Sequence, residues 1–471
     1  MFKKSIWKYI GKVLIGLSIL FIFPILVALI YHESVLPFFI ASFISLVLGL
    51  LLNELKVEDA KLYTRDGLLI VALSWIMMSI IGTIPFCLSG SCGFIDALFE
   101  TVSGFTTTGA SIFDDVEHLS KSVLFFRSFT HFIGGMGILT FVMAVIPLSK
   151  KDNSMHILKA EMPGPSVSKL VPSTKKTLIY LYSIYIGLTV TEMILLLIGG
   201  MPLFDSILIS MGTAGTGGFS VLNSSLATYS VFCKYVVAIF MFLFGINFYI
   251  YFLILMKDFK NVFKSEELRV YILLFIGSIL FVFFNTVNMF TNASEAFLEA
   301  FFHVSSAMTS TGYGIGDINI YPTTCRVLFL SLMLISACAG STCGGFKISR
   351  LIIVFKSIKR ELQKIIFPSR VQTITFEGKK LDEDIIHNTS SFMFLYFILV
   401  FVFIFIISFN GFSLSETINA VFTTFGNVGL CFEISSFSHF SDFSKIVFSV
   451  AMLLGRLEIF PMIVLFSRNY K

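Results

Sequence analysis

Four short segments of small and hydroxyl-bearing residues interrupt the apolar stretches of this chain. Their final three residues are Thr107, Thr108 and Gly109; Thr216, Gly217 and Gly218; Ser310, Thr311 and Gly312; and Asn427, Val428 and Gly429. A polar backbone segment at membrane depth is tolerated only where it is buried in protein or lines a water-filled path. Backbone carbonyls can there replace the hydration shell of a cation, which requires four contributors in a ring. The four segments are therefore candidates for one cation-binding site.

An acidic residue precedes each of the four glycines by the same 13 residues. The acids are Asp96, Asp205, Glu299 and Glu416. Each is followed by an apolar run of about two to three turns. This predicts a short helix that begins at the acid and points its negative C-terminal end at the glycine segment. An ordinary helix-ending glycine is the alternative for one copy, but four copies at one spacing indicate an internal repeat.

The composition places the chain in a membrane. Of its 471 residues, 56% are hydrophobic and 13% are charged, against about 25% charged in soluble domains. We expect an all-α integral membrane protein in which four pseudo-repeats of outer helix, pore helix, filter loop and second helix surround one central pore. The expected parts are a leading helix pair at 1–66 and repeats at 67–176, 177–268, 269–388 and 389–471. Hydrophobic length predicts about ten spans, with unbroken second helices over 123–148, 229–256 and 443–466.

The loops between the expected spans differ in charge. Those at 149–176, 257–269 and 356–380 are basic, and the positive-inside rule places them and both termini in the cytoplasm, with the filter segments facing outward. The outward loops carry Asp114, Asp115, Glu117, Asp317, Glu433 and Asp442. These acids either raise the local cation concentration or are ordinary solvated loop charges. The net charge of +5 thus reflects topology, and we expect no nucleic-acid partner.

The second helix of the third repeat, at 327–355, is interrupted by a polar stretch. The stretch contains Ala339, Gly340, Ser341, Thr342, Cys343, Gly344 and Gly345. Each glycine costs a helix about 1 kcal/mol relative to alanine, so we expect an unwound loop. Because it lies below the third filter segment, it can cross the pore as a mobile barrier. The alternative is a small-residue seam for helix packing.

Arg456 lies near the middle of the last expected span, where a charge is costly and functional by default. Glu458 is two residues away and does not face it on a helix. We therefore expect Arg456 to bind free carbonyls of the 336–345 stretch and to regulate cation passage, with a structural ion pair between helices as the alternative. Arg127 and Lys347 lie nearer helix ends, and we expect them to extend their charges toward the membrane surface.

Other classes of protein fit the sequence less well. The seven histidines are scattered and the seven cysteines follow no metal-ligand spacing, so we do not expect an enzyme. A secondary transporter of an organic solute would show inverted repeats, whereas these four run in one orientation. Cys87 and Cys92 fall near the outward face, where they form either a disulfide or two free thiols.

Several stretches resemble the Trk/Ktr/HKT superfamily of potassium transporters, and most of all its bacterial TrkH/TrkG branch. They lie at 102–110, 134–137, 160–165, 339–345 and 455–458. The resemblance implies that the ring binds potassium as the transported ion, that the 339–345 loop with Arg456 is the gate, and that the chain carries no cofactor of its own. It also implies a homodimer in the lipid of the bacterial cytoplasmic (inner) membrane, with a cytosolic TrkA-type regulatory ring that binds the nucleotide. The fourth segment, with Asn427, is closer to Ktr members, which leaves a sodium-dependent or sodium-permeable transporter as the alternative.

Overall fold

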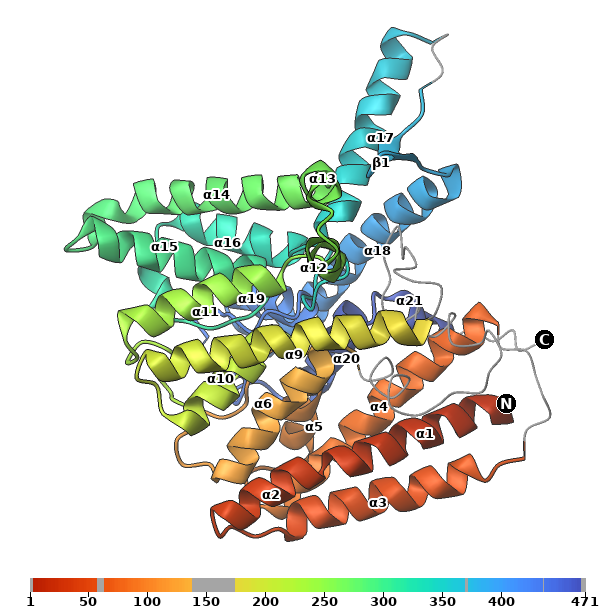
Figure 1. Cartoon of the computed structure of the whole chain (residues 1–471), viewed down its shortest axis with the longest axis vertical. Helices are drawn as coiled ribbons and strands as arrows, with labels where there is room; N and C mark the ends of the chain where they lie inside the picture. Colours follow the sequence, from red (N-terminus) through yellow and green to blue (C-terminus); the bar gives the residue numbers. More distant parts are fainter. Residues whose placement is uncertain (1–2, 57–62, 138–173, 369–371, 435, 467–471) are drawn as a thin grey trace.

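The computed structural model describes residues 3–56, 63–137, 174–368, 372–434 and 436–466. Helices dominate these residues, and the regular structure among them includes one two-stranded hairpin (Figure 1). Six described helices are long and apolar enough to cross a membrane, or seven if the bent pair α11 (Val231–Phe244) and α12 (Phe248–Leu255) counts as one span. The expected all-α membrane fold is confirmed.

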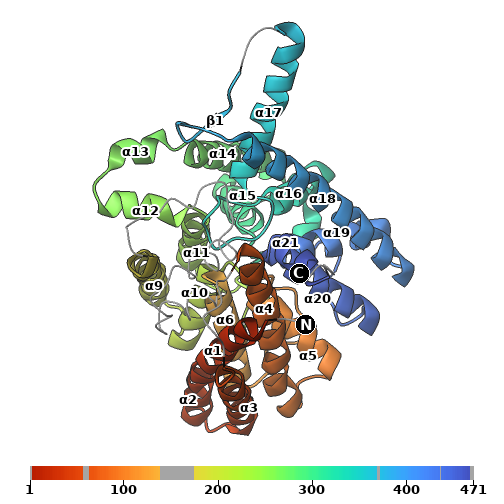
Figure 2. The same cartoon turned by 90° about the vertical axis from the view of Figure 1, so that its right-hand side faces the viewer.

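The described chain begins with an antiparallel arrangement of apolar helices. α1 (Lys4–Leu20) continues into α2 (Ile22–Ile30), and α3 (Leu36–Asn53) returns beside them at one end of the molecule (Figures 1 and 2). α1 and α3 approach closely because two glycines face each other. A Cβ added at Gly11 would lie only 2.8 Å from the carbonyl oxygen of Gly49. These helices pack against the first helix of the first repeat.

Each repeat places a long outer helix before a short pore helix and a second helix. In repeats 1 and 2 these are α4 (Thr64–Leu88), α5 (Phe94–Phe105) and α6 (Lys121–Gly135), then α9 (Thr174–Ile198), α10 (Leu203–Gly215) and α11. In repeats 3 and 4 they are α14 (Glu266–Thr286), α15 (Ala293–Met308) and α16 (Thr323–Ile335), then α18 (Glu383–Ile407), α19 (Leu414–Phe425) and α20 (Asp442–Arg456). Short 3₁₀ turns are η1 (Val287–Met289), η2 (Ile318–Ile320) and η3 (Ser408–Asn410). The pore helices have 12 to 16 residues, or about 18–24 Å, too short to cross a bilayer.

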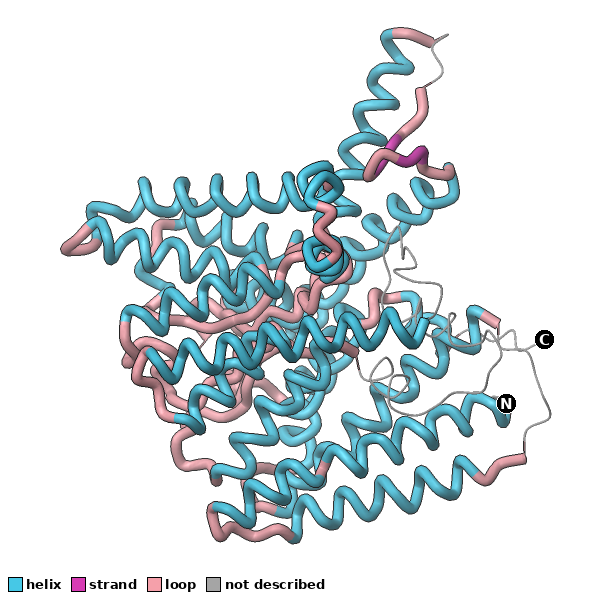
Figure 3. The backbone as a smooth tube through the Cα atoms, in the orientation of Figure 1, coloured by secondary structure: helices cyan, strands magenta, loops and turns pink. Residues whose placement is uncertain are grey.

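The four repeats close into a ring. Each pore helix packs against the second helix of the preceding repeat: α10 against α6, α15 against α11, α19 against α16, and α5 against α20. The last of these contacts joins the first repeat to the fourth and completes the circle. Loop segments gather in the middle of the molecule, between the helices (Figure 3). The fold thus brings the four polar segments, which follow the pore helices, to one central place.

The expectation that three of the second helices run unbroken is wrong. α6 ends at Gly135, α11 and α12 meet at a bend of 92°, and α20 stops at Arg456 before α21 (Phe460–Leu465). The part of the first helix expected after residue 137 lies outside the described residues. Because these helices are short, fewer described helices pass as full spans than the ten that hydrophobic length predicts.

Two of the breaks coincide with features that the structure shows. In repeat 2 the hydroxyl of Tyr271 donates to the carbonyl oxygen of Phe242 at 3.0 Å and occupies the space beside Gly245, where the helix would continue. In repeat 4 Glu458 and Ile459 have φ of +56° and +65°, values that a right-handed helix excludes. A contact from α14 in repeat 2, and a change of backbone conformation in repeat 4, thus mark helix ends that hydrophobicity does not report.

The interruption expected in the third repeat is confirmed. A non-helical loop joins α16 to α17 (Ile348–Ile366), and α17 projects beyond the rest of the molecule (Figures 1 and 2). After α17 a small hairpin pairs β1 (Thr375–Phe376) with β2 (Lys379–Lys380) in antiparallel register. The short helix α13 (Phe259–Lys264) leads into α14 near this hairpin (Figure 1). The hairpin is the one departure, among the described residues, from an all-helical chain.

Candidate functional site

The four filter segments share one backbone conformation. In each, two residues of positive φ flank one other residue. These pairs are Thr107 (+54°) and Gly109 (+80°), Thr216 (+53°) and Gly218 (+77°), Ser310 (+51°) and Gly312 (+87°), and Asn427 (+54°) and Gly429 (+79°). Residues other than glycine adopt this region rarely, and threonine, being β-branched, does so at a cost. The sequence repeat therefore corresponds to a repeated backbone geometry.

The four glycines mark a closed ring. A Cβ added at Gly109 would lie well under 3.0 Å from the carbonyl oxygen of Gly217 in the next repeat. In the same way, a Cβ at Gly218 would meet the carbonyl oxygen of Thr311, one at Gly312 that of Val428, and one at Gly429 that of Thr108. Real Cβ atoms essentially never approach backbone oxygens so closely. The structure thus brings the four predicted filter segments together in a closed ring, with a backbone carbonyl oxygen of the next segment beside each glycine.

The fourth segment differs from the others in carrying an amide. The Nδ2 atom of Asn427 donates to Oγ1 of Thr108 at 2.9 Å and to the carbonyl oxygen of Met452 at 2.9 Å. Asparagine is also several-fold enriched at positive φ. The departure noted in the sequence therefore has a structural reason, because this side chain links the fourth segment to the first and to α20.

Most of the repeat acids occupy the predicted place. Those in the first turn of their pore helices are Asp96, Asp205 and Glu416. The prediction for Glu299 is wrong, because α15 already begins at Ala293. Glu299 instead accepts a hydrogen bond from the hydroxyl of Tyr321 at 3.1 Å, and its carboxylate lies 3.2 Å from Nδ1 of His303. The distance in sequence from the acid to the glycine is therefore the same in all four repeats, but the distance from the start of the pore helix to the glycine is longer in repeat 3.

Arg127 is buried behind the ring, so the prediction that it extends to the membrane surface is wrong. Its Nε donates to Glu100 at 2.8 Å, and both side chains are almost fully buried. Glu100 also accepts from the backbone N–H of Ile112 at 3.0 Å, and the guanidinium lies over the ring of Phe219 at 4.1 Å. Glu100 is not among the residues predicted from the sequence. The available signal was that a charge inside an apolar helix needs a partner.

The loop between α16 and α17 lies against three of the four filter segments. The backbone N–H of Gly344 donates to Oγ of Ser310 at 3.0 Å, and Oγ1 of Thr216 donates to the carbonyl oxygen of Thr342 at 3.2 Å. A Cβ added at Gly344 would lie 2.8 Å from the carbonyl oxygen of Gly426, next to the fourth segment. Residues 339–345 and the ring therefore form one continuous site.

Arg456 holds the loop from a different side. Its Nη1 donates to the carbonyl oxygen of Thr342 at 2.6 Å. Its Nη2 donates to the carbonyl oxygens of Gly134 at 2.6 Å and Gly135 at 2.9 Å, at the end of α6. The expectation that Arg456 binds free carbonyls of the loop is confirmed. One side chain thus connects the third repeat, the fourth repeat and the first.

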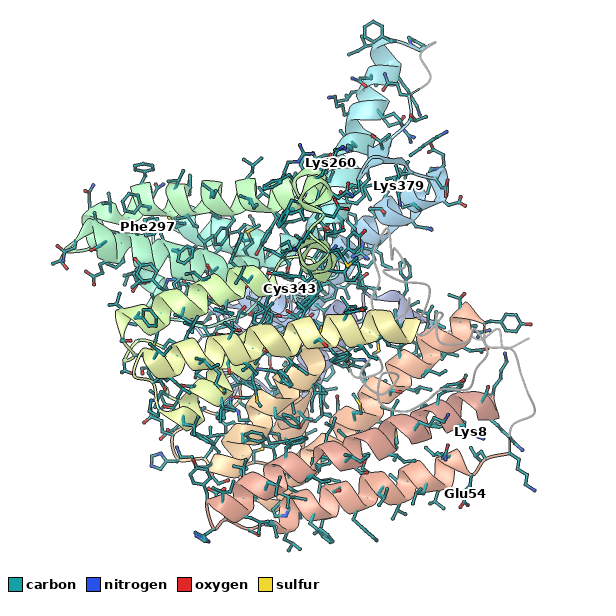
Figure 4. All side chains as sticks on the ribbon, viewed as in Figure 1. Lys8, Glu54, Lys260, Phe297, Cys343 and Lys379 are labelled. Carbon is teal, nitrogen blue, oxygen red and sulfur yellow. The ribbon has the colours of Figure 1, made fainter. Side chains whose placement is uncertain are left out.

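Further charged side chains gather beside the loop. Lys347 is buried and its Nζ donates to the carbonyl oxygen of Cys343, so the prediction that it extends to the surface is wrong. Glu458 forms an ion pair with Arg350 of α17. A cavity of about 70 Å³ beside the loop is lined by Lys347, Arg456 and Glu458 among others. Cys343, whose carbonyl oxygen binds Lys347, is buried and is labelled near the middle of the view in Figure 4. Two cationic side chains and one carboxylate are thus among the residues that line this cavity.

Two acids of the loops that we expect to face outward form hydrogen bonds with neighbouring repeats. Oδ1 of Asp115 accepts from Nδ2 of Asn223 at 2.8 Å, and Asp114 accepts from the hydroxyl of Ser436. The hydrogen bond from Ser436 holds the pKa of Asp114 below its usual value, and the one from Asn223 does the same for the pKa of Asp115. These acids therefore connect repeat 1 to repeats 2 and 4 in addition to carrying loop charge.

The remaining candidate side chains form no further site. Cys87 and Cys92 are free thiols and do not form a disulfide with each other. Burial raises the pKa of the Cys92 thiol to about 12, which keeps it uncharged at neutral pH. No group of three or more His, Cys, Asp or Glu side chains is arranged to hold a metal ion within the described ranges.

Comparison with known proteins identifies the family. The family model TrkH, described as a cation transport protein, matches residues 34–470. The chain belongs to the TrkH family. With its long apolar helices, this TrkH-family chain is a multi-pass membrane protein, and its family is one of transporters and not of enzymes.

Relatives of the TrkH-family chain cover nearly its whole length. The Trk system potassium uptake protein TrkG of Escherichia coli is 34% identical, with 94% of this chain and 93% of that protein aligned. The Trk system potassium uptake protein TrkH of the same species is 32% identical over 99% of both chains. The crystal structure of the potassium transporter TrkH from Vibrio parahaemolyticus matches with a TM-score of 0.89 at 29% identity, covering 99% of this chain and 98% of that one.

Proposed function

We propose that this chain takes up potassium across the membrane through a channel-like pore whose selectivity filter is the ring of four segments. The observation that carries the proposal is the closed ring of glycines and carbonyl oxygens from Gly109 through Gly218 and Gly312 to Gly429. Such a ring can exchange the hydration shell of potassium for protein oxygens. The names of the relatives, potassium uptake proteins and a potassium transporter, support this choice of ion.

The loop at 339–345 acts as the gate, and Arg456 holds it closed. Contacts of Thr342 and Gly344 with the ring support this role, as does the bond from Arg456 to Thr342. The cations Lys347 and Arg456 beside the loop add an electrostatic barrier to the steric one. Opening requires that the loop leave these partners.

The chain works as a homodimer in the bacterial cytoplasmic membrane, with both termini in the cytoplasm. A cytosolic TrkA-type ring, which binds the nucleotide, controls the gate. The basic loops at 257–269 and 356–380 support this orientation. The relatives' names support a regulatory partner because they describe components of a Trk system.

A sodium-dependent or sodium-permeable transporter is the second candidate. The amide of Asn427, placed where the other segments carry a hydroxyl, makes the fourth quarter of the ring chemically different. An ion ring with one unlike quarter can differ in its discrimination between potassium and sodium. The same experiment distinguishes the two candidates.

Growth at limiting potassium tests the proposal. The host is a bacterium without its own potassium uptake systems, and it expresses the chain with or without a TrkA-type partner. A Gly312→Ser variant, in which the new Cβ meets the carbonyl oxygen of Val428, serves as the filter control. We expect growth with the native chain and loss of growth, or sodium leak, with Gly312→Ser at equal membrane insertion. Growth that requires added sodium would favour the second candidate, and no rescue with either a TrkA-type or a Ktr-type partner would contradict potassium uptake.

A further inference from the structure

A second side chain, that of Glu267, also binds the gate loop. Glu267, in the first turn of α14, is 5% exposed, and its Oε1 accepts a hydrogen bond from the backbone N–H of Ala339 at 2.7 Å. Hydrogen bonds to a carboxylate are about twice as strong as those between neutral groups. The loop is therefore fastened at two points of opposite polarity. Arg456 binds the carbonyl oxygen of Thr342, whereas Glu267 binds an amide.

The hairpin fixes the position of Glu267. Oε1 of Glu377 accepts from the backbone N–H of Glu267 at 2.9 Å and from Oγ of Ser265 at 3.0 Å. Glu377 and the following Gly378 have φ of +49° and +73°, the two positive values of a type I′ turn, in which asparagine or aspartate usually precedes glycine. A glutamate is unusual there, and its longer side chain reaches the start of α14.

The hairpin and the loop also share an apolar cluster. Ile374 and Phe376 of the hairpin are buried in the same cluster as Ala337 and Cys338, which precede the loop. The hairpin lies at the end of the molecule from which α17 projects, where Figure 4 marks Lys379. A displacement of the hairpin would therefore be passed to the start of α14 and from there to the loop.

We propose that Glu267 is a positioning residue that keeps the gate loop against the ring, and that the hairpin at 374–381 sets the position of Glu267. The proposal rests on the proposed function, in which the loop is the barrier. A force applied to the hairpin moves Glu267 through Glu377 and withdraws Ala339 from below the ring. The hairpin is thus the surface through which a cytosolic regulator acts on the gate loop.

Hydrogen–deuterium exchange of the purified full chain tests the anchor without reference to any ion. The measured quantity is the exchange rate of a peptide that contains Ala339. In Glu267→Ala we expect faster exchange, by on the order of tenfold, while Glu267→Gln, which keeps an oxygen acceptor, exchanges at an intermediate rate. The matched control is Glu266→Ala, because Glu266 pairs instead with Lys356 at 2.7 Å. Unchanged exchange in Glu267→Ala, or equal acceleration in Glu266→Ala, would overturn the proposal.

Ion flux tests what the anchor does. Rubidium uptake into liposomes that hold the chain without a partner should rise by on the order of tenfold in Glu267→Ala. It should stay near the native level in Glu266→Ala, with the ratio of potassium to sodium uptake unchanged in both. Native flux in Glu267→Ala would overturn the positioning role even if its exchange were faster.

The hairpin supplies a second variant in case Glu267→Ala does not fold. Glu377→Ala removes the support of Glu267 from the surface and should change exchange and flux in the same direction, whereas Lys379→Ala on the same hairpin should change neither. If both hairpin variants matched the native chain, the hairpin would have no role. Failure of the native chain to move potassium with any partner would overturn the proposed function, while the exchange experiment would still decide whether Glu267 anchors the loop.

Discussion

Arg456 and Thr342 are joined by a hydrogen bond of 2.6 Å from the guanidinium Nη1 to a backbone carbonyl oxygen. Arg456 lies in the fourth repeat and Thr342 in the third. The same guanidinium also donates to the carbonyl oxygens of Gly134 and Gly135 in the first repeat. A hydrogen bond that involves a charged group contributes about 1.5–3 kcal/mol net. The position of the loop is therefore coupled to the end of α6 through a single side chain.

Replacing Arg456 should favour the open loop. Arg456→Ala removes the bonds to Thr342 and to α6, and losing one such bond changes an equilibrium by about 10- to 100-fold. We expect rubidium uptake without a partner to rise by at least about tenfold, with a smaller rise in Arg456→Lys because an ammonium lacks the guanidinium fork. Arg326→Ala, which removes an arginine that pairs with Glu433 and not with the loop, is the control. Native uptake in Arg456→Ala would show that the arginine is only structural.

A comparison of two glycines separates backbone strain from obstruction of the ring. Gly218 and Gly411 have φ of +77° and +79°, but a Cβ at Gly218 meets the carbonyl oxygen of Thr311, whereas one at Gly411 has no neighbour within 4 Å. Both alanine variants should lose about 1–2 kcal/mol of stability from the left-handed backbone. Only Gly218→Ala should also lose potassium selectivity, measured as the ratio of potassium to sodium uptake in liposomes. Equal selectivity in the two variants would contradict the ring.

The buried ion pair between Arg127 and Glu100 should be essential to stability. Removing one partner leaves an uncompensated buried charge, so Arg127→Ala should reduce the free energy of unfolding by about 3–5 kcal/mol. Breaking the exposed pair of Lys364 and Glu361 with Lys364→Ala should leave the free energy of unfolding nearly unchanged, because solvent screens exposed ion pairs. Thermal unfolding in detergent, followed by the fraction that remains monodisperse, measures both. A small effect of Arg127→Ala would mean that the Glu100 carboxylate finds another donor.

The link from Asp114 to Ser436 should weaken in acid. Because this hydrogen bond lowers the pKa of Asp114 below its usual value, its stabilisation is fully present above the unfolded-state pKa and is lost as the pH falls through the lowered folded-state value. The melting temperature of the native chain should therefore fall more steeply below about pH 4 than that of Asp114→Asn. Asp384→Asn, an exposed acid of α18, is the control. Parallel pH profiles for the native chain and Asp114→Asn would contradict the assignment.

The parts of the site that could be predicted are those written in local sequence. Four glycines after apolar runs mark positions where the backbone needs φ near +80°, and adjacent glycines at 344–345 mark the loop. The charge of Arg456 at membrane depth indicated a carbonyl partner, since Glu458 could not face it on a helix. In each case one short stretch carried the information.

The parts that could not be predicted depend on contacts between distant residues. Tyr271 ends α11 from another helix, and nothing near Gly245 in the sequence reports this. Arg127 and Lys347 have the sequence pattern of charges near helix ends, but the ring and the loop bury them from directions that helix periodicity does not encode. Glu267 lies in a stretch whose composition is that of a basic loop, and its partner Ala339 is 72 residues away in sequence.

A single chain supplies all four quarters of the ring, and each quarter is chemically distinct. In a pore assembled from four identical subunits, every substitution is present in four copies, so the effect of a single copy cannot be measured separately. Here one segment can be altered while the other three stay native. The contribution of each segment can therefore be measured by combining substitutions one at a time. The same asymmetry places the 339–345 loop in only one of the four repeats, so a substitution in the loop also leaves the other three repeats native.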